Sequence, residues 1–193
     1  MTSNRIKEVA LNHFTKNGYE GTSMAQIADE VGIKKQSIYT HFKGKDELFL
    51  QVCSDVFDDE LRFVIDFIEN NTTRPIEDFL FGFLSDYKDR YEKNDNTKFW
   101  LRISFFPPTH LYEQVMKSVY EYLDQLEELL FPIMEKAMKD GKISSTTDAK
   151  RAVAAFLGVL DGILVEMLYG GPERSLKRLD ASWYVYWRGL SKN

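Results

Sequence analysis

The sequence has little cysteine, proline or histidine, and it contains no long apolar run. A single cysteine, Cys53, excludes an intramolecular disulfide framework and is typical of a reducing compartment. The three histidines, His13, His41 and His110, are scattered without the spacing of metal ligands. No stretch approaches 18 uninterrupted apolar residues, and the N-terminal residues lack the apolar segment of a signal peptide. We therefore expect a cytoplasmic protein with no metal, no cofactor and no membrane partner.

Signatures of common enzyme classes are also missing. The sequence has no Gly-rich phosphate-binding loop, no Gly-x-Ser-x-Gly nucleophile motif and no His-Glu-x-x-His zinc motif. Cys53 has no histidine near it in the sequence that would activate its thiol. The sequence therefore predicts a protein that is not an enzyme.

Helical periodicity of the apolar residues runs through nearly the whole chain, and strand alternation is almost absent. At 193 residues and 44% hydrophobic content, the chain can bury one substantial core, or a small domain joined to a larger one. Turn-rich breaks divide it into about nine helices, so we predict an all-α fold. The expected helices run from a cap at Thr2 or Ser3 to Gly18, from Ser23 to Gly32, and over residues 33–42, 45–71, 75–92, 96–106, 108–140, 147–169 and 172–190.

Charge is distributed unevenly along the chain. The formal net charge is −5, yet residues 34–45 hold four lysines and no acidic residue. An acidic body with one local basic patch indicates a polyanion that is contacted at a defined edge.

Residues 22–42 have the pattern of a helix-turn-helix. Ser23 and Gln26 have capping-box spacing, and Gly32 ends the apolar periodicity that follows them. In the next segment Ile38 and Phe42 share one face, whereas lysines and hydroxyl-bearing side chains occupy the other. A major groove admits one such helix, with lysines and hydroxyls on the phosphates. A solvated basic face on a small helical bundle is the alternative interpretation, but the coincidence of cap, turn and patch favours DNA binding.

The stretch "GYEGTSMAQIADEVGIKKQSIYTHFKGKDELF" resembles the N-terminal region of the TetR family of bacterial transcriptional regulators, and the similarity covers about residues 5–50. The resemblance implies a three-helix DNA-binding domain over residues 1–46, followed by a larger helical ligand-binding and dimerisation domain over residues 47–193. Lys34 and Gln36 stand where many members carry a small or hydroxyl residue and a glycine, so the operator sequence does not follow from the family. By position, the resemblance implies phosphate contacts at Thr22, Ser23, Tyr39, His41 and Lys45, and base-reading positions at Met24, Lys35, Gln36 and Ser37.

Aromatic residues are unusually dense between residues 79 and 122. Aromatic walls suit a flat or lipophilic small molecule, and members of the family hold inducers among the equivalent helices. Ordinary core packing is the alternative for most of these side chains. Arg102 also has two interpretations: it pairs with an anionic ligand, or it forms a salt bridge at the edge of the core. The candidate ligand-binding residues are Phe63, Phe67, Phe83, Tyr87, Trp100, Phe105, Met116 and Tyr120.

The last two expected helices carry small residues and large aromatics at helical spacing. Such a pattern indicates either a subunit interface or burial within the chain, and the resemblance implies a two-fold dimer through these helices. A dimer that reads an inverted repeat is also expected because one helix-turn-helix makes few specific contacts. The candidate interface residues are Ala155, Val159, Gly162, Ile163, Glu166, Trp183 and Trp187.

Together these patterns predict a homodimeric, DNA-binding transcriptional regulator. We expect a repressor that leaves a palindromic operator when it binds a hydrophobic or aromatic small molecule. A ligand-responsive activator, or a helical interaction module that does not bind DNA, is the alternative. The sequence does not identify the effector, the operator or the regulated genes.

Overall fold

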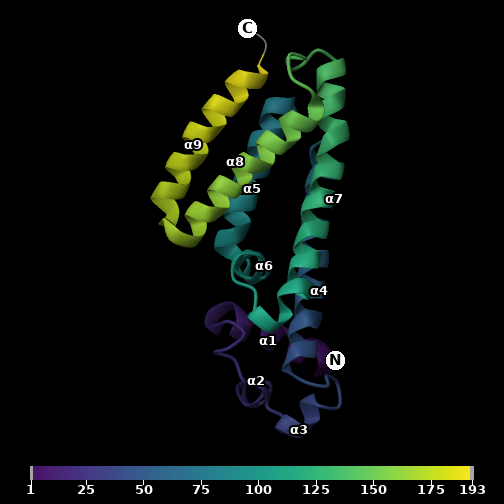
Figure 1. Cartoon of the computed structure of the whole chain (residues 1–193), viewed down its shortest axis with the longest axis vertical. Helices are drawn as coiled ribbons and strands as arrows, with labels where there is room; N and C mark the ends of the chain where they lie inside the picture. Colours follow the sequence, from purple (N-terminus) through teal and green to yellow (C-terminus); the bar gives the residue numbers. More distant parts are fainter. Residues whose placement is uncertain (1, 192–193) are drawn as a thin grey trace. The chain divides into compact units, whose positions relative to one another are not determined.

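The computed structural model describes residues 2–191. Within that range the chain forms nine α-helices and one 3-10 turn and contains no strand, which confirms the predicted all-α fold. The elements are α1 (Thr2–Asn17), α2 (Met24–Val31), α3 (Lys35–Ile38), α4 (Lys45–Asn71), α5 (Ile76–Lys93), α6 (Asp95–Phe105), η1 (Thr109–Leu111), α7 (Tyr112–Lys139), α8 (Ala149–Tyr169) and α9 (Gly171–Leu190), as Figure 1 shows.

Several expected boundaries differ from the structure by one or two residues, and three other differences affect how a helix begins or ends. Thr2 and Ser3 already belong to α1, so neither residue caps that helix from outside. The expected helix over residues 33–42 is shorter, because α3 ends at Ile38 and hydrogen-bonded turns follow it. The expected helix over residues 108–140 begins as η1, and regular α-helix starts only at Tyr112.

The contacts divide the chain into two compact units. Unit 1 contains the described residues up to Arg62 together with Lys93–Tyr122, and unit 2 contains Phe63–Glu92 together with the chain from Leu123 onward. Helices α4 and α7 therefore each contribute one part to unit 1 and the other part to unit 2.

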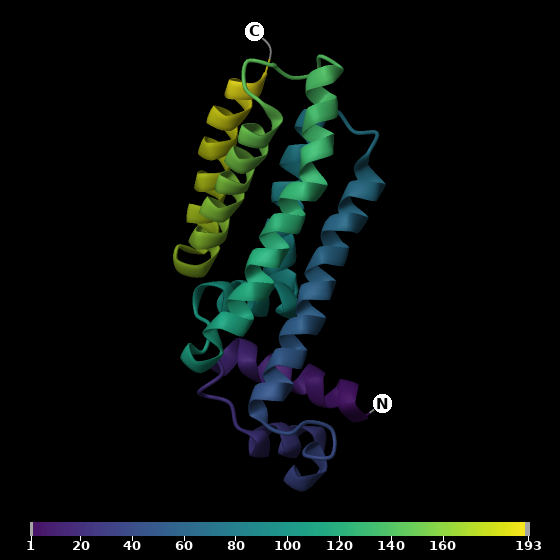
Figure 2. The ribbon, with the colours of Figure 1, turned by 45° about the vertical axis from the view of Figure 1, so that its right-hand side comes forward.

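The core of unit 1 forms where α1, α4 and α6 meet. Phe14, Phe49 and Phe99 are fully buried, and the Phe49 ring lies edge-on to the other two at centroid distances of 5.0 and 5.7 Å. An Arg102 Nη1 donates to the carbonyl oxygen of Thr15 at 3.2 Å, which ties α6 to the end of α1. Figure 2 shows α1 crossing the start of α4, and α2 and α3 lie together on the same side of α1. This core holds the two short helices α2 and α3 in place.

Helices α8 and α9 dominate unit 2 and lie side by side in antiparallel directions (Figures 1 and 2). Phe156 of α8 is fully buried between Phe83 and Tyr186, whose ring centroids are 5.9 and 5.8 Å away. The Tyr186 hydroxyl also donates to the carbonyl oxygen of Ala152 at 2.9 Å. Helix α8 is long and apolar enough to cross a membrane, a property that core helices of soluble proteins share. Its packing on α9 accounts for part of that apolar character.

Candidate nucleic-acid interface

Helix α2 begins and ends as its sequence predicts. The Ser23 hydroxyl accepts from the backbone N–H of Gln26 at 3.3 Å, and the Gln26 side chain accepts from the Ser23 N–H at 2.8 Å. Gly32 ends the helix at φ +79°, and its N–H donates to the carbonyl oxygens of Ala28 and Asp29. The left-handed conformation is one that glycine adopts without strain. The expected capping box and turn glycine are therefore confirmed.

Helix α3 docks one face on unit 1 and leaves the other in solvent. Ile38 is fully buried and Phe42 nearly so, while Lys35, Gln36 and Tyr39 are exposed. After Ile38 the chain turns through hydrogen bonds from His41 and Phe42 to the Ile38 carbonyl oxygen. The sequence of this segment is rich in residues of modest helix propensity, which favours an early end. The result is a short platform that presents polar side chains outward.

The structure separates the predicted DNA-binding residues into two groups. Ser23, Lys34, Lys35, Gln36, Tyr39 and His41 are exposed, and Ser37 is half-buried. Thr22 and Met24 are buried, and the Thr22 hydroxyl donates to the Gly18 carbonyl oxygen at 2.8 Å. Burial gives these two residues a role in holding the α1–α2 loop. Their contact with DNA, like that of the exposed group, stays a prediction.

Lys45 has partners inside the protein. Its ammonium donates to the carbonyl oxygens of Tyr19 and Thr22 at 2.9 and 3.1 Å, and it lies 3.9 Å from the centre of the Tyr19 ring. An ammonium has three donors, so these contacts leave one for another acceptor. The structure thus assigns Lys45 to anchoring the α1–α2 loop on α4, and its predicted phosphate contact is untested.

Two exposed residues near α3 were not among the predicted DNA-binding residues, although Lys43 belongs to the basic patch of residues 34–45. Lys43 is exposed next to the start of α4, and its backbone N–H donates to the Glu47 carboxylate at 2.5 Å. Thr40 is exposed as well, and its hydroxyl donates to the Ser37 carbonyl oxygen. The lysine run "KGK" was the only signal in the sequence for Lys43, and nothing there pointed to Thr40.

A polar cluster of Tyr19, Asp46 and His110 joins distant segments of unit 1. The Tyr19 hydroxyl donates to the Asp46 carboxylate, and His110 Nε2 lies 3.5 Å from an oxygen of the same carboxylate. The hydrogen bond from Tyr19, followed by that from His110, lowers the pKa of Asp46. Burial and then the bond to Asp46 raise the pKa of Tyr19. Sequence reasoning missed this cluster because 64 positions separate Asp46 from His110 in the chain.

Four of the eight predicted ligand residues lie in unit 2 and four lie in unit 1, and their contact with a ligand stays a prediction. In unit 2 the Phe83 ring lies 5.2 Å from Phe67 and 6.0 Å from Tyr87, and Phe63 lies 5.7 Å from Tyr87. In unit 1 Trp100 is buried against Phe57 and Tyr122, Met116 is half-buried, and Phe105 and Tyr120 are exposed. The first four residues therefore form an aromatic cluster, and the others are distributed elsewhere.

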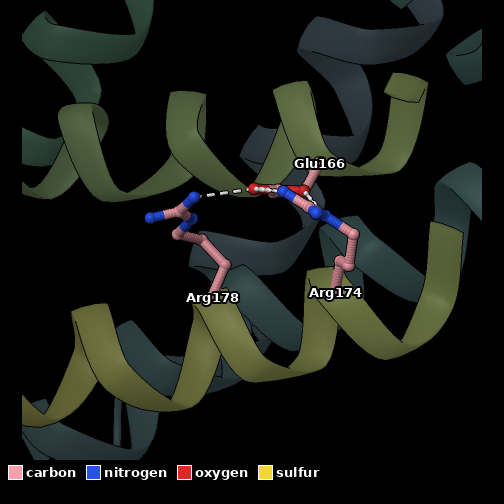
Figure 3. Close-up of polar contacts among 3 residues, drawn as sticks. All are labelled: Glu166, Arg174 and Arg178. Carbon is pink, nitrogen blue, oxygen red and sulfur yellow. Dashed lines mark hydrogen bonds and ion pairs between the residues drawn. The ribbon is translucent and has the colours of Figure 1, made fainter. Parts of the chain in front are cut away.

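The predicted interface residues fall on both faces of α8 and α9. Ala155 is exposed, and Val159, Gly162, Trp183 and Trp187 are half-buried. Ile163 is fully buried, and Glu166 has 8% of its surface exposed. The Glu166 carboxylate accepts from Arg174 at 2.9 Å and from Arg178 at 2.7 Å, and both arginines come from α9 (Figure 3). These bonds lower the pKa of Glu166 to about 2, so this side chain already has partners within its own subunit.

The outer face of α8 and α9 is rich in small and apolar residues and open to solvent, with the exposed Asp161 among them. A Cβ built on Gly158 or Gly162 meets no atom within 4 Å, so the space beside these two glycines is open. On α9, Tyr184 and Val185 are 59% and 71% exposed. We call this surface the outer α8/α9 face; its exposed small and apolar residues are Ala154, Ala155, Gly158, Val165, Tyr169, Leu176, Tyr184 and Val185.

Comparison with known proteins gives a consistent result. The family model described as bacterial regulatory proteins, tetR family, matches residues 6–52, which include α2, α3 and the start of α4. The chain is 29% identical over 157 residues to IcaR of Staphylococcus aureus, an HTH-type negative transcriptional regulator of the biofilm operon icaADBC. That alignment covers 79% of this chain and 78% of the relative.

Two solved structures share the fold along nearly the whole chain. A TetR-family regulator from Agrobacterium tumefaciens has a TM-score of 0.79 at 19% identity and covers 99% of this chain and 98% of its own. FadR from Bacillus subtilis, solved in complex with stearoyl-CoA, has a TM-score of 0.71 at 16% identity, with 95% and 96% covered. These similarities indicate the same function as the capped α2 and the outward polar face of α3. Residues 6–52 therefore carry the DNA-binding region of the tetR family of bacterial regulatory proteins, and together with the similarity to IcaR they show a DNA-binding transcriptional regulator of the TetR type.

Proposed function

We propose that this protein is a homodimeric repressor that binds a palindromic operator and leaves it on binding a hydrophobic or aromatic small molecule. One observation carries the DNA-binding part of this proposal. Ile38 and Phe42 anchor α3 in unit 1, and the polar side chains between them, with the preceding lysines, face solvent. In this proposal residues 1–46 contact the DNA, with Lys35 and Gln36 at base edges and Tyr39 on a phosphate.

The repressor assignment is supported by IcaR, which its name describes as a negative regulator. Because a repressor and an activator bind DNA through the same kind of surface, the structure of α3 does not separate them. A ligand-responsive activator is therefore the alternative, and a helical module without DNA binding is a weaker one.

The outer α8/α9 face supports a dimer. Small residues on α8 allow a second helix to approach closely, and the exposed Tyr184 and Val185 gain from burial. A second copy of the chain satisfies both conditions through a two-fold axis, because each copy presents the same surface. We propose that residues 47–193 supply this interface and that the two α3 helices then read the two halves of the operator.

The effector assignment rests on the aromatic side chains and on one relative. Phe63, Phe67, Phe83 and Tyr87 form an aromatic cluster in unit 2. FadR was solved with stearoyl-CoA, a ligand with a long apolar chain. A hydrophobic effector follows by analogy, and we further propose a cytoplasmic location and no catalytic activity.

Selection of binding sites from a random double-stranded DNA pool tests this function. An inverted repeat should emerge, with a binding constant that falls steeply as salt rises because phosphate contacts release counterions. Recovery of no preferred sequence, with no salt dependence, contradicts the proposal and favours the interaction module. In vitro transcription from a promoter that carries the selected site then separates repressor from activator by the sign of the change.

A further inference from the structure

A cavity of ≈ 260 Å³ lies within unit 1, next to the contact between α1 and α6. None of the eight ligand residues predicted from the sequence lines it. It is half open to solvent and is lined by the end of α1, the loop after it, α4, α6 and the segment that leads to η1. Its lining shares no residue with the aromatic cluster in unit 2, so it is a separate candidate site.

The floor of the cavity is apolar and aromatic. Phe14, Phe49 and Phe99 are at most 1% exposed, and Ile103 is 3% exposed. The Phe14 and Phe49 rings meet edge to face at 5.0 Å, and Tyr19 stacks on Phe14 at 6.2 Å. These rings are packed against one another and close the bottom of the cavity. The apolar surface that a flat ligand can reach is that of Tyr19, Phe106 and Pro107 on the same lining, and Phe106 is 55% exposed.

One cation, Arg102, lines the cavity and has spare donors. Its side chain is half-buried, and its one hydrogen bond within the described residues goes to the carbonyl oxygen of Thr15. No carboxylate in residues 2–191 forms an ion pair with it, so the salt bridge that the sequence left open as an alternative is absent there. A guanidinium has five N–H donors in a planar fork that matches a carboxylate. Most of these donors are therefore free for a ligand.

Glycine at position 18 keeps the space beside this guanidinium open. A Cβ at Gly18 would lie 2.9 Å from Arg102 Nη2, closer than such contacts occur. The residue also has φ +71° at the end of α1, a conformation that favours glycine. Gly18 thus ends the helix and also leaves one edge of the Arg102 guanidinium unblocked.

The remaining polar residues on the lining favour an anion over a cation. Glu20 is the one acidic side chain there, and it is exposed, so water screens it. Arg102 is half-buried and therefore interacts with a ligand in a less polar setting. Asn17 and Thr109 add neutral hydrogen-bonding groups.

We propose that this cavity binds a small aromatic carboxylate, with the carboxylate on Arg102 and the ring against Tyr19, Phe106 and Pro107. The volume sets the size, since pockets for drug-sized ligands measure about 300–1,000 Å³ and this one is smaller. A molecule of one or two fused rings fits it. A carboxylate that bonds both Nη atoms also takes the Nη1 donor that holds the Thr15 carbonyl oxygen, and so weakens the link between α6 and α1. Any effect of this weakened link on operator binding rests on the proposed function, whereas the binding of the carboxylate to the cavity does not.

Isothermal titration of the full-length protein with 2-naphthoate tests the site without DNA. The matched probes are 2-naphthalenemethanol, which is neutral, and 2-naphthylmethylammonium, which is cationic. Naphthoate should bind at least about tenfold more tightly than either, because a hydrogen bond to a charged group contributes about 1.5–3 kcal/mol. Equal affinity for all three probes contradicts a role for Arg102.

Variants locate the probe in the cavity. Arg102→Gln should weaken naphthoate binding by at least about tenfold, and Arg102→Lys should recover only part of it because an ammonium lacks the planar fork. Lys98→Gln removes a cation from the same helix outside the lining and should change nothing. Thr109→Trp narrows the cavity while leaving Arg102 in place, and it should also weaken naphthoate binding. This second variant keeps the test possible if Arg102→Gln fails to fold. Unchanged binding in both Arg102→Gln and Thr109→Trp overturns the site.

Operator binding is measured separately on the same protein. If naphthoate binds without DNA and the protein shows no preference for any DNA sequence, the proposed function fails and the cavity site stands. If operator binding is intact and naphthoate does not bind, the cavity site fails and the proposed function stands.

Discussion

Lys45 Nζ lies 2.9 Å from the carbonyl oxygen of Tyr19 and 3.9 Å from the centre of its ring. The same ammonium bonds the Thr22 carbonyl oxygen, so one side chain at the start of α4 fixes both ends of the loop between α1 and α2. This loop leads directly into the capping box at Ser23. The position of the helix-turn-helix therefore depends on a lysine that lies outside it.

We expect Lys45→Met to destabilise the protein by about 1–3 kcal/mol, because the Tyr19 and Thr22 carbonyl oxygens then lose a charged donor. Urea unfolding monitored by circular dichroism measures the change. Lys43→Met is the matched control, since Lys43 is exposed and its side chain is not part of this anchor. Equal stability of the two variants would show that the anchor contributes nothing.

Gln36→Ala should relax base preference at one position of each half-site and cost about 1–3 kcal/mol there, because glutamine pairs with adenine through two hydrogen bonds. Tyr39→Phe removes one exposed hydroxyl and should weaken all sequences about equally. Site selection with each variant separates the two effects. An unchanged sequence logo for Gln36→Ala would rule out base reading by this residue.

Gly162→Arg should abolish the dimer and lower operator affinity with it. The subunit itself tolerates a side chain that starts at this position, since a Cβ at Gly162 meets no atom within 4 Å. The arginine would instead project into the partner and bring an unpaired charge into the interface. Analytical ultracentrifugation reports the change, with Ser145→Arg in the exposed turn before α8 as control. A Gly162→Arg protein that sediments as a dimer places the interface elsewhere.

Glu166 should contribute a pH-dependent part of stability. Bonds from Arg174 and Arg178 hold its folded-state pKa at about 2, below the ordinary value of 4.5. The contribution is therefore complete above pH 4.5 and is lost as the pH falls from there toward 2. Glu166→Gln should be less stable than the wild type at pH 7, with a difference that shrinks over that window. Glu173→Gln, an exposed acid on α9, is the control, and a parallel pH profile for both variants would exclude this role.

Local patterns in the sequence were sufficient to predict where the helices lie and to predict the helix-turn-helix. The capping box at Ser23 and the glycine at position 32 involve partners within a few residues, so spacing alone predicts them. The early end of α3 was not predicted, because a turn places Ile38 and Phe42 on the same side of the chain as well as a helix does. Periodicity gave no information on which turn would form.

The features that the sequence did not predict depend on contacts between segments that are distant in the chain. The sequence identifies Arg102 as a charged residue among apolar neighbours, but not that it would meet the end of α1 rather than an acid. Glu166 looked like an interface residue because it follows the small residues of α8 at helical spacing. Its partners are on α9, and a pairing across a turn between two helices depends on how those helices pack.

The discontinuity of unit 1 limits how this regulator can be recombined. The unit needs Lys93–Tyr122 as well as the chain up to Arg62, because Phe99 and Arg102 of the later segment complete its core. A chimaera made with a single crossover after the helix-turn-helix would join α1 from one parent to α6 from another and leave this contact mismatched. Exchange of DNA specificity between relatives should therefore succeed only when both segments are transferred, or when α3 alone is grafted.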